Sequence, residues 1–470
     1  MIMSQFLSYS VRGNIMNFKN TAAIILAAGK GTRMQSDKPK VLHEVGGLSM
    51  IGHVLTAADQ IDKTIAVVGY GRDEVVAELH RLNPDATAVE QTEQLGTGHA
   101  VQQAEEALKG FTGDVVVLNG DVPLVTPELL EQMFSDHHSQ NNTVTVLTTT
   151  VPDPTGLGRI IRDTDGNFQS IIEHKDATEI QRQVDEINTG IYLVKAPDVF
   201  DLLRQVTNKN ASGEFYLTDI VELARNKGQK VGTCFTDDGP ALLGVNTPQQ
   251  LADAERIFQE RQRLKKLSDG VFLKDPSSVF FSHDTVIGKG TSIGPNVQCL
   301  KGVNIGENNV IEGNTVLKDT TSEAGVTVLS FCHLEGAVIS SGCSVGPFAR
   351  LRPGTGLGQN SKVGNFCEMK NTTLGAGSKA SHLSYLGDAE IGMEVNIGAG
   401  TITCNYDGRN KHKTTIENKA FIGSNTSLVA PVRIGEGALI GAGATIRKDV
   451  GRNELAFTSA QQKQTSKKKA

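Results

Sequence analysis

The side chains with the greatest chemical capability gather in the segment 364–406, GNFCEMKNTTLGAGSKASHLSYLGDAEIGMEVNIGAGTITCNY. Its polar candidates are Lys370, His382, Tyr385, Asn396, Asn405 and Tyr406. A free histidine titrates near pH ~6.5 and can accept a proton at neutral pH, whereas a lysine can bind an anion. An aliphatic residue followed by glycine recurs every six positions around these side chains, and such a repeat does not need them for stacking. The segment therefore predicts a catalytic site on a repetitive scaffold.

A second candidate site follows the apolar run TAAIIL at 21–26, which continues as AAGKGTRM. A strand, a glycine-rich loop and a helix in this order present backbone N–H groups to phosphate, and we expect that order here. The sequence from Gly29 to Thr32 imitates part of a Walker motif, but its earlier glycine is missing and GxGxxG is absent. Arg33 and Lys40 add two cations just downstream. The loop alone fits a structural turn as well as an anion site.

A third candidate, Asn119-Gly120-Asp121, ends the apolar run that begins at residue 114. Ligands of parallel sheets bind outside the carboxyl ends of the strands, where an aspartate can hold a cation that bridges phosphates. A turn aspartate is the alternative that spacing leaves open. These runs, together with KTIAVVGY at 63–70, are separated by helical patterns. The N-terminal half is therefore predicted to be an α/β, Rossmann-like domain with a mainly parallel sheet.

The C-terminal half is predicted to be a left-handed parallel β-helix of hexapeptide repeats. Three registers carry its aliphatic positions, which are Ile287, Ile293, Ile305 and Ile311, then Val345, Leu351, Leu357, Val363 and Met369, then Ile422, Leu428, Ile434, Ile440 and Ile446. With three hexapeptides per coil, about 185 residues give on the order of ten coils. The polar segment 404–413, CNYDGRNKHK, breaks the period and is expected to leave the coils as an exposed loop.

A spacer helix is expected between the two halves, because Leu251, Ala254, Phe258, Leu264 and Leu267 form an apolar stripe among charges. A membrane-surface or calmodulin-target helix is the alternative. The expected organisation is an N-terminal extension at 1–20, the α/β domain at 21–247, a helical linker at 248–269, the β-helix at 270–455 and a flexible tail at 456–470.

The composition excludes several classes of protein. Charged residues make up 21% of the 470 residues and the net charge is −6, so a basic nucleic-acid footprint is absent. The six cysteines, Cys234, Cys299, Cys332, Cys343, Cys367 and Cys404, form no CxxC pair, which is typical of small buried hydrophobes in a reducing compartment. No apolar run is long enough to cross a bilayer, and the first twenty residues lack an apolar signal region. We expect a cytoplasmic protein without membrane partners, whose start is Met1 or Met16.

Ordered motifs give a more specific resemblance. The segments LAAGKGTRM, PK at 39–40, EQLGTGHA, GDVPL, DPTGLGRI, IIEHKDA, EINTGIY and LLGVNTPQQL occur in this order. Together they resemble the nucleotidyltransferases that join sugar 1-phosphates to nucleoside triphosphates. With the β-helix behind them, they resemble the family of bifunctional N-acetylglucosamine-1-phosphate uridyltransferases and glucosamine-1-phosphate acetyltransferases, over roughly residues 21–458.

The resemblance implies a set of roles in the N-terminal half. The residues implied to bind UTP or UDP-N-acetylglucosamine are Leu26, Ala27, Ala28, Gly29, Lys40, Gln91, Gly96, Thr97, Asn119, Gly120, Asp121, Gly158, Glu173, Asn188 and Asn246. Gln91, Gly96 and Thr97 would read uracil, and Arg33 and Lys40 would act catalytically on the phosphates. Asp121 and Asn246 would hold Mg²⁺, which accepts a sparse set of protein oxygens. A sugar 1-phosphate is already an anionic nucleophile, so charge neutralisation and alignment carry the uridylyl transfer.

In the C-terminal half the resemblance implies acetyl transfer from acetyl-CoA to glucosamine 1-phosphate. That reaction needs a neutral amine, and the resemblance assigns the general base to His382. Arg352, Lys370, Tyr385 and Asn396 would bind the sugar phosphate, and Ala399, Asn405, Tyr406, Ser424 and Ala442 would line the acetyl-CoA groove. Hexapeptide β-helices resemble a large group of acyltransferases that form trimers with active sites between adjacent β-helix prisms, so a homotrimer is implied.

One position departs from the family pattern. Where the family usually has an arginine against the coenzyme nucleotide, LAFTSAQQ has Ser459; Lys463 or the lysines at 467–469 could replace it, or form a solvated tail. The leading interpretation is a bifunctional enzyme of UDP-N-acetylglucosamine synthesis. The alternatives are a monofunctional sugar-1-phosphate nucleotidyltransferase with a structural β-helix and a binding solenoid that senses nucleotide sugars.

Overall fold

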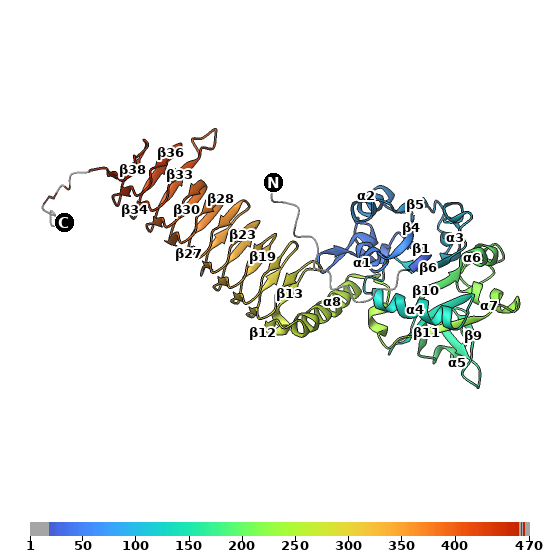
Figure 1. The fold of residues 1–470 in the computed structure, drawn as a ribbon. Coiled ribbons are helices and arrows are strands. Elements are labelled where there is room, and N and C mark those ends of the chain that lie inside the picture. Colours follow the sequence, from blue (N-terminus) through green and yellow to red (C-terminus); the bar gives the residue numbers. More distant parts are fainter. Residues whose placement is uncertain (1–17, 460–461, 463, 466–470) are drawn as a thin grey trace, which may run out of the picture. The chain divides into compact units, whose positions relative to one another are not determined.

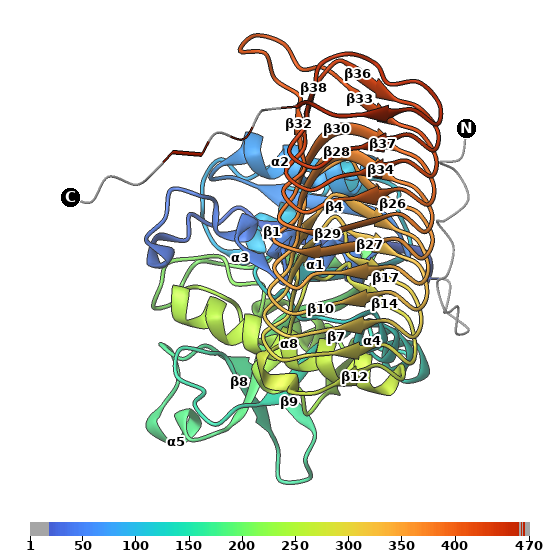
Figure 2. The ribbon, with the colours of Figure 1, turned by 90° about the vertical axis from the view of Figure 1, so that its left-hand side faces the viewer.

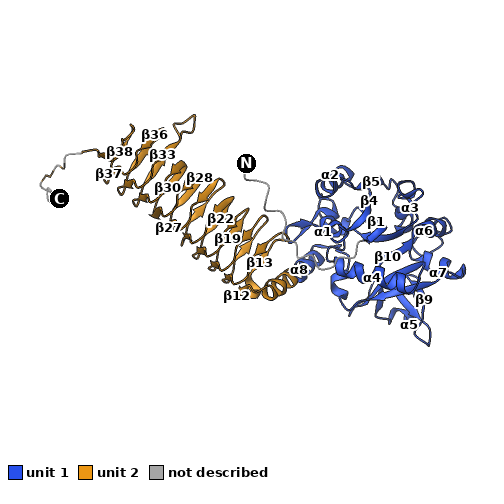
Figure 3. Cartoon of the chain, viewed as in Figure 1, with its two compact units in different colours: residues 1–258 blue, residues 259–470 orange. Residues whose placement is uncertain are grey.

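The computed structural model describes residues 18–459, 462 and 464–465, which form two compact units. The first unit ends at Phe258 and the second begins at Gln259 (Figure 3). Strand β1 begins at Phe18, so the last residues of the expected extension belong to the first strand. Lys463 and the lysines at 467–469 lie outside the described residues.

The first unit is built on a sheet with the strand order β11-β7-β10-β6-β1-β4-β5 (Figure 1). These strands are β1 (Phe18–Ala27), β4 (Ile61–Val68), β5 (Thr87–Glu90), β6 (Asp114–Asn119), β7 (Val144–Thr150), β10 (Glu186–Lys195) and β11 (Val231–Phe235). Only β10 among them runs antiparallel to its neighbours β6 and β7, and the other pairings are parallel. The prediction of a mainly parallel sheet is confirmed. A hairpin of β8 (Arg159–Arg162) and β9 (Phe168–Ile172) extends from β10.

Helices cover both faces of this sheet. One apolar core contains residues of α1 (Met50–Ala57), α2 (Arg72–Leu82) and α4 (Pro127–Ser139). The other contains residues of α3 (Thr97–Gln102), α6 (Ala196–Leu203) and α7 (Asp219–Asn226). The buried runs of β1 and β6 contribute to both cores, as expected for central strands of a three-layer α/β domain. A short helix, α5 (Glu179–Arg182), follows the hairpin, and the 3₁₀ turns η3 (Glu106–Leu108) and η4 (Gly239–Leu242) lie in loops.

The expectation of a helix directly after the glycine-rich loop is wrong. The loop leads into a single 3₁₀ turn, η1 (Thr32–Met34), then η2 (Lys40–Leu42) and the small hairpin of β2 (Glu44–Val45) and β3 (Leu48–Ser49). Gly31 and Gln35, on either side of η1, both adopt left-handed backbone conformations, with φ of 61° and 51°, so a helix cannot continue through them. Phosphate binding at this loop therefore depends on loop amides and cations rather than on a helix terminus.

The second unit is a β-helix of stacked parallel strands (Figures 1 and 2). One sheet contains eleven strands, in agreement with the expected order of ten coils. They are β12 (Phe272–Leu273), β15 (Ser292–Ile293), β18 (Val310–Ile311), β21 (Thr327–Val328), β24 (Ser344–Val345), β27 (Lys362–Asn365), β29 (Lys379–His382), β31 (Asn396–Ile397), β34 (Phe421–Ile422), β37 (Leu439–Ile440) and β39 (Leu455–Ala456).

The remaining strands form a second, 17-stranded sheet that wraps around the rest of each coil. They are β13 (Phe280–Phe281), β14 (Val286–Ile287), β16 (Gln298–Cys299), β17 (Asn304–Ile305), β19 (Val316–Lys318), β20 (Thr321–Ser322), β22 (His333–Glu335), β23 (Ala337–Ile339), β25 (Arg350–Leu351), β26 (Thr355–Leu357), β28 (Glu368–Leu374), β30 (Tyr385–Ile391), β32 (Ile402–Cys404), β33 (Thr414–Ile416), β35 (Ser427–Val429), β36 (Val432–Ile434) and β38 (Thr445–Ile446). The turn η5 (Pro276–Ser278) belongs to the first coil.

The hexapeptide registers are confirmed by burial. All fourteen aliphatic positions predicted from them lie in one continuous apolar core. Ser292 pairs with Val310, eighteen residues on, whereas Val310 pairs with Thr327, seventeen residues on, so one coil absorbs a one-residue slip. Five of the six cysteines are buried, and burial raises the pKa of Cys299 to about 12, so this thiol remains protonated.

Helix α8 (Pro248–Ser268) covers the segment predicted to be an amphipathic helix, but only part of the predicted apolar stripe is buried. Ala254 and Phe258 are buried, whereas Leu264 and Leu267 are 61% and 41% exposed. In the second unit the helix instead buries polar side chains against the first coil. Gln259 exchanges two hydrogen bonds of 2.8 Å with the Phe281 backbone. The end of a β-helix has unpaired backbone groups, so polar side chains cover it better than leucines do.

No helix within the described part of the chain is long and apolar enough to cross a membrane.

Candidate functional sites

The first site is a pocket of about 280 Å³ at the carboxyl ends of β1 and β6. Its walls contain most of the residues predicted to contact the nucleotide. They are Leu26, Ala27, Ala28, Gly29, Lys40, Gln91, Gly96, Thr97, Asn119 and Asp121, with Val41, Gln94, Ala100 and Glu214. The sheet brings these segments together because β1 lies between β4 and β6, so their following loops open on the same edge.

One wall of this pocket is held in place by Gln91. The side chain is 4% exposed, and its amide nitrogen donates to the Gly96 carbonyl at 3.2 Å and lies 3.1 Å from Nδ1 of His99. Gly96 has φ of 113°, and a Cβ there would lie 2.6 Å from the Phe215 carbonyl oxygen. Only glycine fits this position, so the loop before α3 is fixed against the pocket.

The cationic corner of the pocket contains Lys40, Asp121 and Asn246. The Lys40 ammonium forms an ion pair with Asp121 and donates a hydrogen bond to Oδ1 of Asn246 at 2.9 Å. A Cβ on Gly31 would lie 2.6 Å from Cβ of Lys40, so the glycine allows this close approach. The two predicted metal ligands therefore already converge on one positive charge. Arg33 lies on η1 with an exposed side chain and is not among the residues that line the pocket.

The orientation of Asn246 follows from the start of α8. Thr247 accepts a hydrogen bond from the Gln250 amide at 3.2 Å, and Gln250 in turn accepts from the Asn246 amide at 2.8 Å. This reciprocal pair resembles a capping box, with Pro248 in the first helical turn. The Asn246 side-chain amide donates to the Gly244 carbonyl at 3.1 Å, which directs its oxygen towards Lys40.

An adjoining pocket of about 200 Å³ shares Leu26, Thr97 and Asn119 with the first. Its lining contains all three residues implied to bind N-acetylglucosamine, which are Gly158, Glu173 and Asn188. The Asn188 amide donates to the Gly158 carbonyl at 2.9 Å. A Cβ on Gly158 would lie 3.3 Å from Oε1 of Glu173, so this glycine keeps the carboxylate accessible.

The carboxylates around this second pocket are only partly solvated. Burial raises the pKa of Glu173, and a hydrogen bond from the Thr218 hydroxyl opposes that rise. Burial together with the charges of Glu222 and Asp176 raises the pKa of Asp219 to about 6. Glu173, which lines the second pocket, is therefore a carboxylate of reduced acidity, as is Asp219, which is not among the lining residues.

Sequence reasoning missed several residues of these pockets. Gln94 lines the first pocket and donates to the Ala28 carbonyl at 3.1 Å, although it lies within the EQLGTGHA motif. Glu214 and Thr218 come from a loop between α6 and α7 that carries no motif, so only the three-dimensional structure shows them at the pockets.

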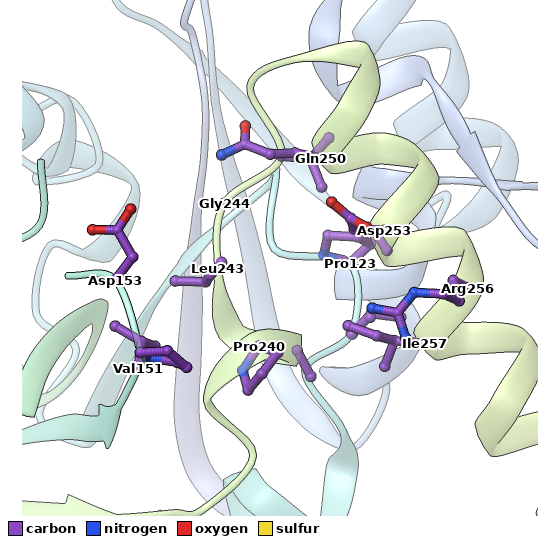
Figure 4. A pocket seen from close by; sticks show the side chains of 15 residues that line it. Pro123, Val151, Asp153, Pro240, Leu243, Gly244, Gln250, Asp253, Arg256 and Ile257 are labelled. Atoms are coloured by element: carbon purple, nitrogen blue, oxygen red, sulfur yellow. The ribbon is translucent and has the colours of Figure 1, made fainter. Parts of the chain in front are cut away.

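A larger pocket of about 360 Å³ in the same unit contains none of the predicted site residues (Figure 4). It lies between α8 and the segments 123–124, 151–153 and 240–245, and its walls are mainly apolar. Gln250, which positions Asn246, is one of its few polar wall residues.

In the second unit, one column of residues follows a corner of the β-helix. Asn365 and His382 are direct partners in β27 and β29. Ala399, Ser424 and Ala442 continue the column on the next three coils. The backbone carbonyls of Asn365, His382, Ala399 and Ser424 each accept a hydrogen bond of 2.7–3.4 Å from a backbone amide of the next coil. The predicted base and three predicted acetyl-CoA residues, called here the His382 column, are thus stacked in register.

The imidazole of His382 is exposed and held on one side only. Its Nδ1 lies 2.7 Å from Oδ1 of Asn365. Because an amide oxygen can only accept, this contact places the proton on Nδ1 and leaves the lone pair on Nε2. That is the form in which a histidine can take a proton from an amine.

A second patch lies on the 17-stranded sheet and consists of Arg352, Lys370 and Lys411, called here the cation cluster. Contact with Lys411, and then the charges of Lys411 and Arg352, lower the pKa of Lys370. Arg352 also forms a 2.9 Å ion pair with Glu368. Repulsion among three cations is relieved by an anion, so this patch suits a phosphate. Lys411 was missed by sequence reasoning because it lies in the irregular segment 404–413.

Tyr385 belongs to the same patch. The residue pair Lys370 and Gly387 is in register between β28 and β30. A Cβ on Gly387 would lie 2.5 Å from the Tyr385 hydroxyl, so the phenol lies across this glycine. Asn396 instead begins β31, on the other sheet, in the strand that leads to the His382 column.

The segment 404–413 leaves the coil as expected, and Tyr406 pairs with Lys411 across it. Tyr406 is 61% exposed. Asn405 is buried and donates to Asp388 at 2.5 Å. Asn405 and Tyr406 do not lie in the His382 column, because their loop follows β32 of the 17-stranded sheet. Ser459 is exposed just beyond the last strand, β39.

Comparison with known proteins agrees with both halves of this description. Residues 23–186 match the family described as MobA-like NTP transferase domain. Residues 413–448 match the bacterial transferase hexapeptide family, and residues 284–318 match the hexapeptide repeat of succinyl-transferase. The chain is therefore a nucleotidyltransferase joined to a hexapeptide transferase.

Whole-length relatives define the combination. The chain is 47% identical to the bifunctional protein GlmU of Acinetobacter baumannii (strain AYE) over 445 residues, which covers 94% of this chain and 97% of that protein. It is 45% identical to the GlmU protein of Zymomonas mobilis over 447 residues, with 94% and 95% covered. It is 43% identical to the GlmU protein of Streptococcus thermophilus over 442 residues, again with 94% and 95% covered. The chain belongs to the bifunctional GlmU family.

Membership of the GlmU family decides between the alternative functions that the sequence left open. The chain is a bifunctional enzyme of UDP-N-acetylglucosamine synthesis, with a nucleotidyltransferase half and an acetyltransferase half. A purely structural β-helix behind a monofunctional enzyme is set aside, as is a binding solenoid.

Proposed function

We propose that the adjoining pockets of the first unit carry uridylyl transfer from UTP to N-acetylglucosamine 1-phosphate, and that the His382 column carries acetyl transfer to glucosamine 1-phosphate. The observation that carries the proposal is the register of the column. A base with its lone pair directed outward lies in line with three residues predicted to contact the coenzyme. The product of the second unit is then the substrate of the first.

In the first unit, Gln91, Gly96 and Thr97 bind uracil, while Gly158, Glu173 and Asn188 bind the sugar. The amides of the Leu26–Gly29 loop and the Lys40 ammonium face the triphosphate between them. They hold the sugar phosphate oxygen in line with the α-phosphorus and reduce the repulsion between two anions. Arg33, which is exposed on η1, reaches the outer phosphates rather than the pocket floor.

Asp121 and Asn246 are suited to hold Mg²⁺. Their oxygens converge on the Lys40 ammonium, so this corner stabilises a cation, and carboxylate and amide oxygens are ligands that Mg²⁺ accepts. When bound, the ion supplies charge neutralisation at the phosphates. Lys40 then binds phosphate oxygens instead of the two side chains.

In the second unit, Nε2 of His382 takes a proton from the substrate amine, and the neutral nitrogen attacks the acetyl carbonyl of acetyl-CoA. The amide forms, the thioester bond breaks, and coenzyme A leaves as the thiol after protonation. Arg352, Lys370 and Lys411 bind the sugar phosphate, with Tyr385 and Asn396 beside the sugar. Ala399, Ser424 and Ala442 lie along the coenzyme, with Asn405 and Tyr406 contributed by the loop.

We further propose a homotrimer, because the loop with Asn405 and Tyr406 follows a strand of the 17-stranded sheet and does not lie in the column that it must complete. A neighbouring copy can supply the missing wall. Mixing chains that carry His382→Ala with chains that carry Arg352→Ala tests this, after dissociation and reassembly. If each site takes His382 from one copy and Arg352 from another, random assembly leaves roughly a quarter of the sites with both residues intact. No recovery of acetyl transfer in the mixture would contradict a shared site.

The overall proposal is tested by following free thiol released from acetyl-CoA. Release should require glucosamine 1-phosphate, and further addition of UTP and Mg²⁺ should yield pyrophosphate. Thiol release with no dependence on glucosamine 1-phosphate would overturn the substrate assignment. The substrates UTP and acetyl-CoA are those of the cytoplasm, which is the compartment we propose.

A further inference from the structure

The first unit contains an arginine that is buried without an acidic partner. Arg159, at the start of β8, is 1% exposed and is the largest fully buried side chain among the described residues. No ion pair found within the described part of the chain includes it. A buried guanidinium is costly unless its N–H groups are satisfied, so a neutral side chain would be favoured here if only packing mattered.

Its two Nη atoms instead contact three neutral acceptors on the two loops that surround the sugar pocket, while its Nε has no hydrogen-bond partner among the described residues. It donates to the Leu157 carbonyl and, through Nη2, to the Arg182 carbonyl at 3.4 Å. The same nitrogen lies 3.3 Å from Nδ1 of His174. Leu157 precedes Gly158, and His174 follows Glu173. One side chain therefore fastens both loops, each immediately beside a predicted sugar contact.

The strand register also places Arg159 beside the predicted sugar contacts. Arg159 is the residue of β8 that pairs with both Ile172 of β9 and Ile187 of β10. Each of these three residues is directly adjacent in the chain to a predicted sugar contact. Gly158 precedes Arg159, Glu173 follows Ile172 and Asn188 follows Ile187. The buried guanidinium thus lies at the junction of the three strands that supply the sugar pocket.

We propose that Arg159 is a positioning residue for the N-acetylglucosamine subsite. It keeps Gly158, Glu173 and Asn188 at fixed separations, and its positive charge favours the carboxylate form of Glu173, which accepts hydrogen bonds from sugar hydroxyls. It touches no substrate itself. This inference rests on the proposed sugar subsite and adds the residue that holds it together.

The test compares Arg159→Met, which keeps the length of the side chain without its donors, with Arg159→Lys and with Arg162→Met. Arg162 ends the same strand, beside the turn between β8 and β9, and binds Glu186 of β10 and the Gly166 carbonyl rather than the loops of the sugar pocket, so it controls for general loosening of β8. We expect Arg159→Met to raise the KM for N-acetylglucosamine 1-phosphate at least tenfold, with the KM for UTP within twofold. Arg159→Lys should show a smaller rise, and Arg162→Met none.

Two further measurements separate positioning from a merely structural role. The acid limb of the pH profile of kcat/KM for the sugar phosphate should move to higher pH in Arg159→Met, because the positive charge of Arg159 opposes the rise in the pKa of Glu173. Acetyl transfer by the same chains should be unchanged, which controls for folding and concentration. A sugar KM within twofold of wild type, or equal rises in both KM values, would overturn the inference.

Failure of the underlying subsite would look different. If Glu173→Ala and Asn188→Ala leave the sugar KM unchanged, the proposed subsite is wrong. If they raise it while folded Arg159→Met and Arg159→Lys do not, only the positioning role of Arg159 is wrong. If Arg159→Met fails to fold, a wild-type sugar KM in Arg159→Lys overturns the inference, and a raised one supports it.

Discussion

The two sites of this chain are built in opposite ways from the same kind of strand. In the first unit the loops after β1 and β6, together with those before α3 and α8, converge on one corner, so that segments 200 residues apart meet at Lys40, Asp121 and Asn246. In the second unit the residues stay in register with the coils, so they form a column and a patch on different sheets.

The difference shows what each fold contributes to catalysis. A parallel sheet gathers its loops at one edge, so one chain can enclose a small molecule. A β-helix repeats one cross-section, so a residue is placed accurately along the column but has nothing opposite to it. The first pocket is therefore enclosed within its own unit, whereas the second site is the one for which we propose a wall from a neighbouring copy. Variants that act on one activity and spare the other test this separation.

The largest expected effect comes from His382, the proposed general base in the His382 column. His382→Ala should lower kcat of acetyl transfer by about 10²–10⁴-fold, which is the usual contribution of a general base, and leave uridylyl transfer unchanged. Thiol release and pyrophosphate release from the same preparation measure the two activities. His333→Ala, which removes another exposed histidine of the β-helix, is the matched control. Acetyl transfer near the wild-type rate in His382→Ala would show that the base lies elsewhere.

The reverse separation is expected at the corner of the first pocket. Asp121→Ala combined with Asn246→Ala should reduce uridylyl transfer by about 10²–10³-fold, because the charges on the triphosphate lose their counter-ion. Chelation of Mg²⁺ by EDTA should have the same selective effect, with acetyl transfer retained. Asp237→Ala, at an exposed position of the same unit, is the control. Full turnover of UTP by the double variant would contradict the metal assignment.

These contrasts also explain how far the sequence could predict the molecule. The buried β-helix positions followed from a six-residue period, and the glycine-rich loop and Asp121 of the first pocket followed from motifs that end strands, because both are local patterns; the other predicted pocket residues came from the family resemblance. The side chain of Leu264 could not be placed in this way, since its exposure depends on the polar end of the first coil. Lys411 was missed because its contact with Lys370 joins two segments with no common period.

The 3₁₀ turn after the glycine-rich loop is a further feature that the local sequence did not predict. The composition of AAGKGTRM is compatible with the start of a helix, and only the left-handed conformations of Gly31 and Gln35 end it. Glu214 and Thr218 reach the pockets from a loop without a motif. Local chemistry thus predicts which strand ends line the pockets, whereas the residues of the other walls depend on tertiary packing.

A smaller effect is expected at the cation cluster. Lys411→Ala should raise the KM for glucosamine 1-phosphate by about tenfold, equivalent to about 1.4 kcal/mol, because the phosphate loses one of three cations. The pKa of Lys370 should rise at the same time, since contact with Lys411 is the main cause of its lowering. Lys413→Ala is the matched control, because Lys413 lies two residues further on and pairs with Glu390. Equal KM values for the two variants would remove Lys411 from the site.

The smallest expected effect concerns stability and is confined to the first unit. The pKa of Asp219 is raised to about 6 from an ordinary value of 3.8, chiefly by burial. The folded chain therefore binds more protons than the unfolded chain between these values, so the stabilising effect is fully present below about pH 4 and is lost as the pH rises through 6. Asp219→Asn should remove this loss, with a difference of at most about 1 kcal/mol because the group is half-exposed.

Far-ultraviolet circular dichroism can assign this effect to one unit, because nearly all helical residues of the described chain precede Gln259. The urea midpoint of the helical signal should fall between pH 4 and pH 7 more steeply in the wild type than in Asp219→Asn. Asp59→Asn, at an exposed position of the same unit, should follow the wild type. Identical pH profiles for wild type and Asp219→Asn would show that the carboxyl is solvated, and that the wall beside the sugar pocket is more open than the structure indicates.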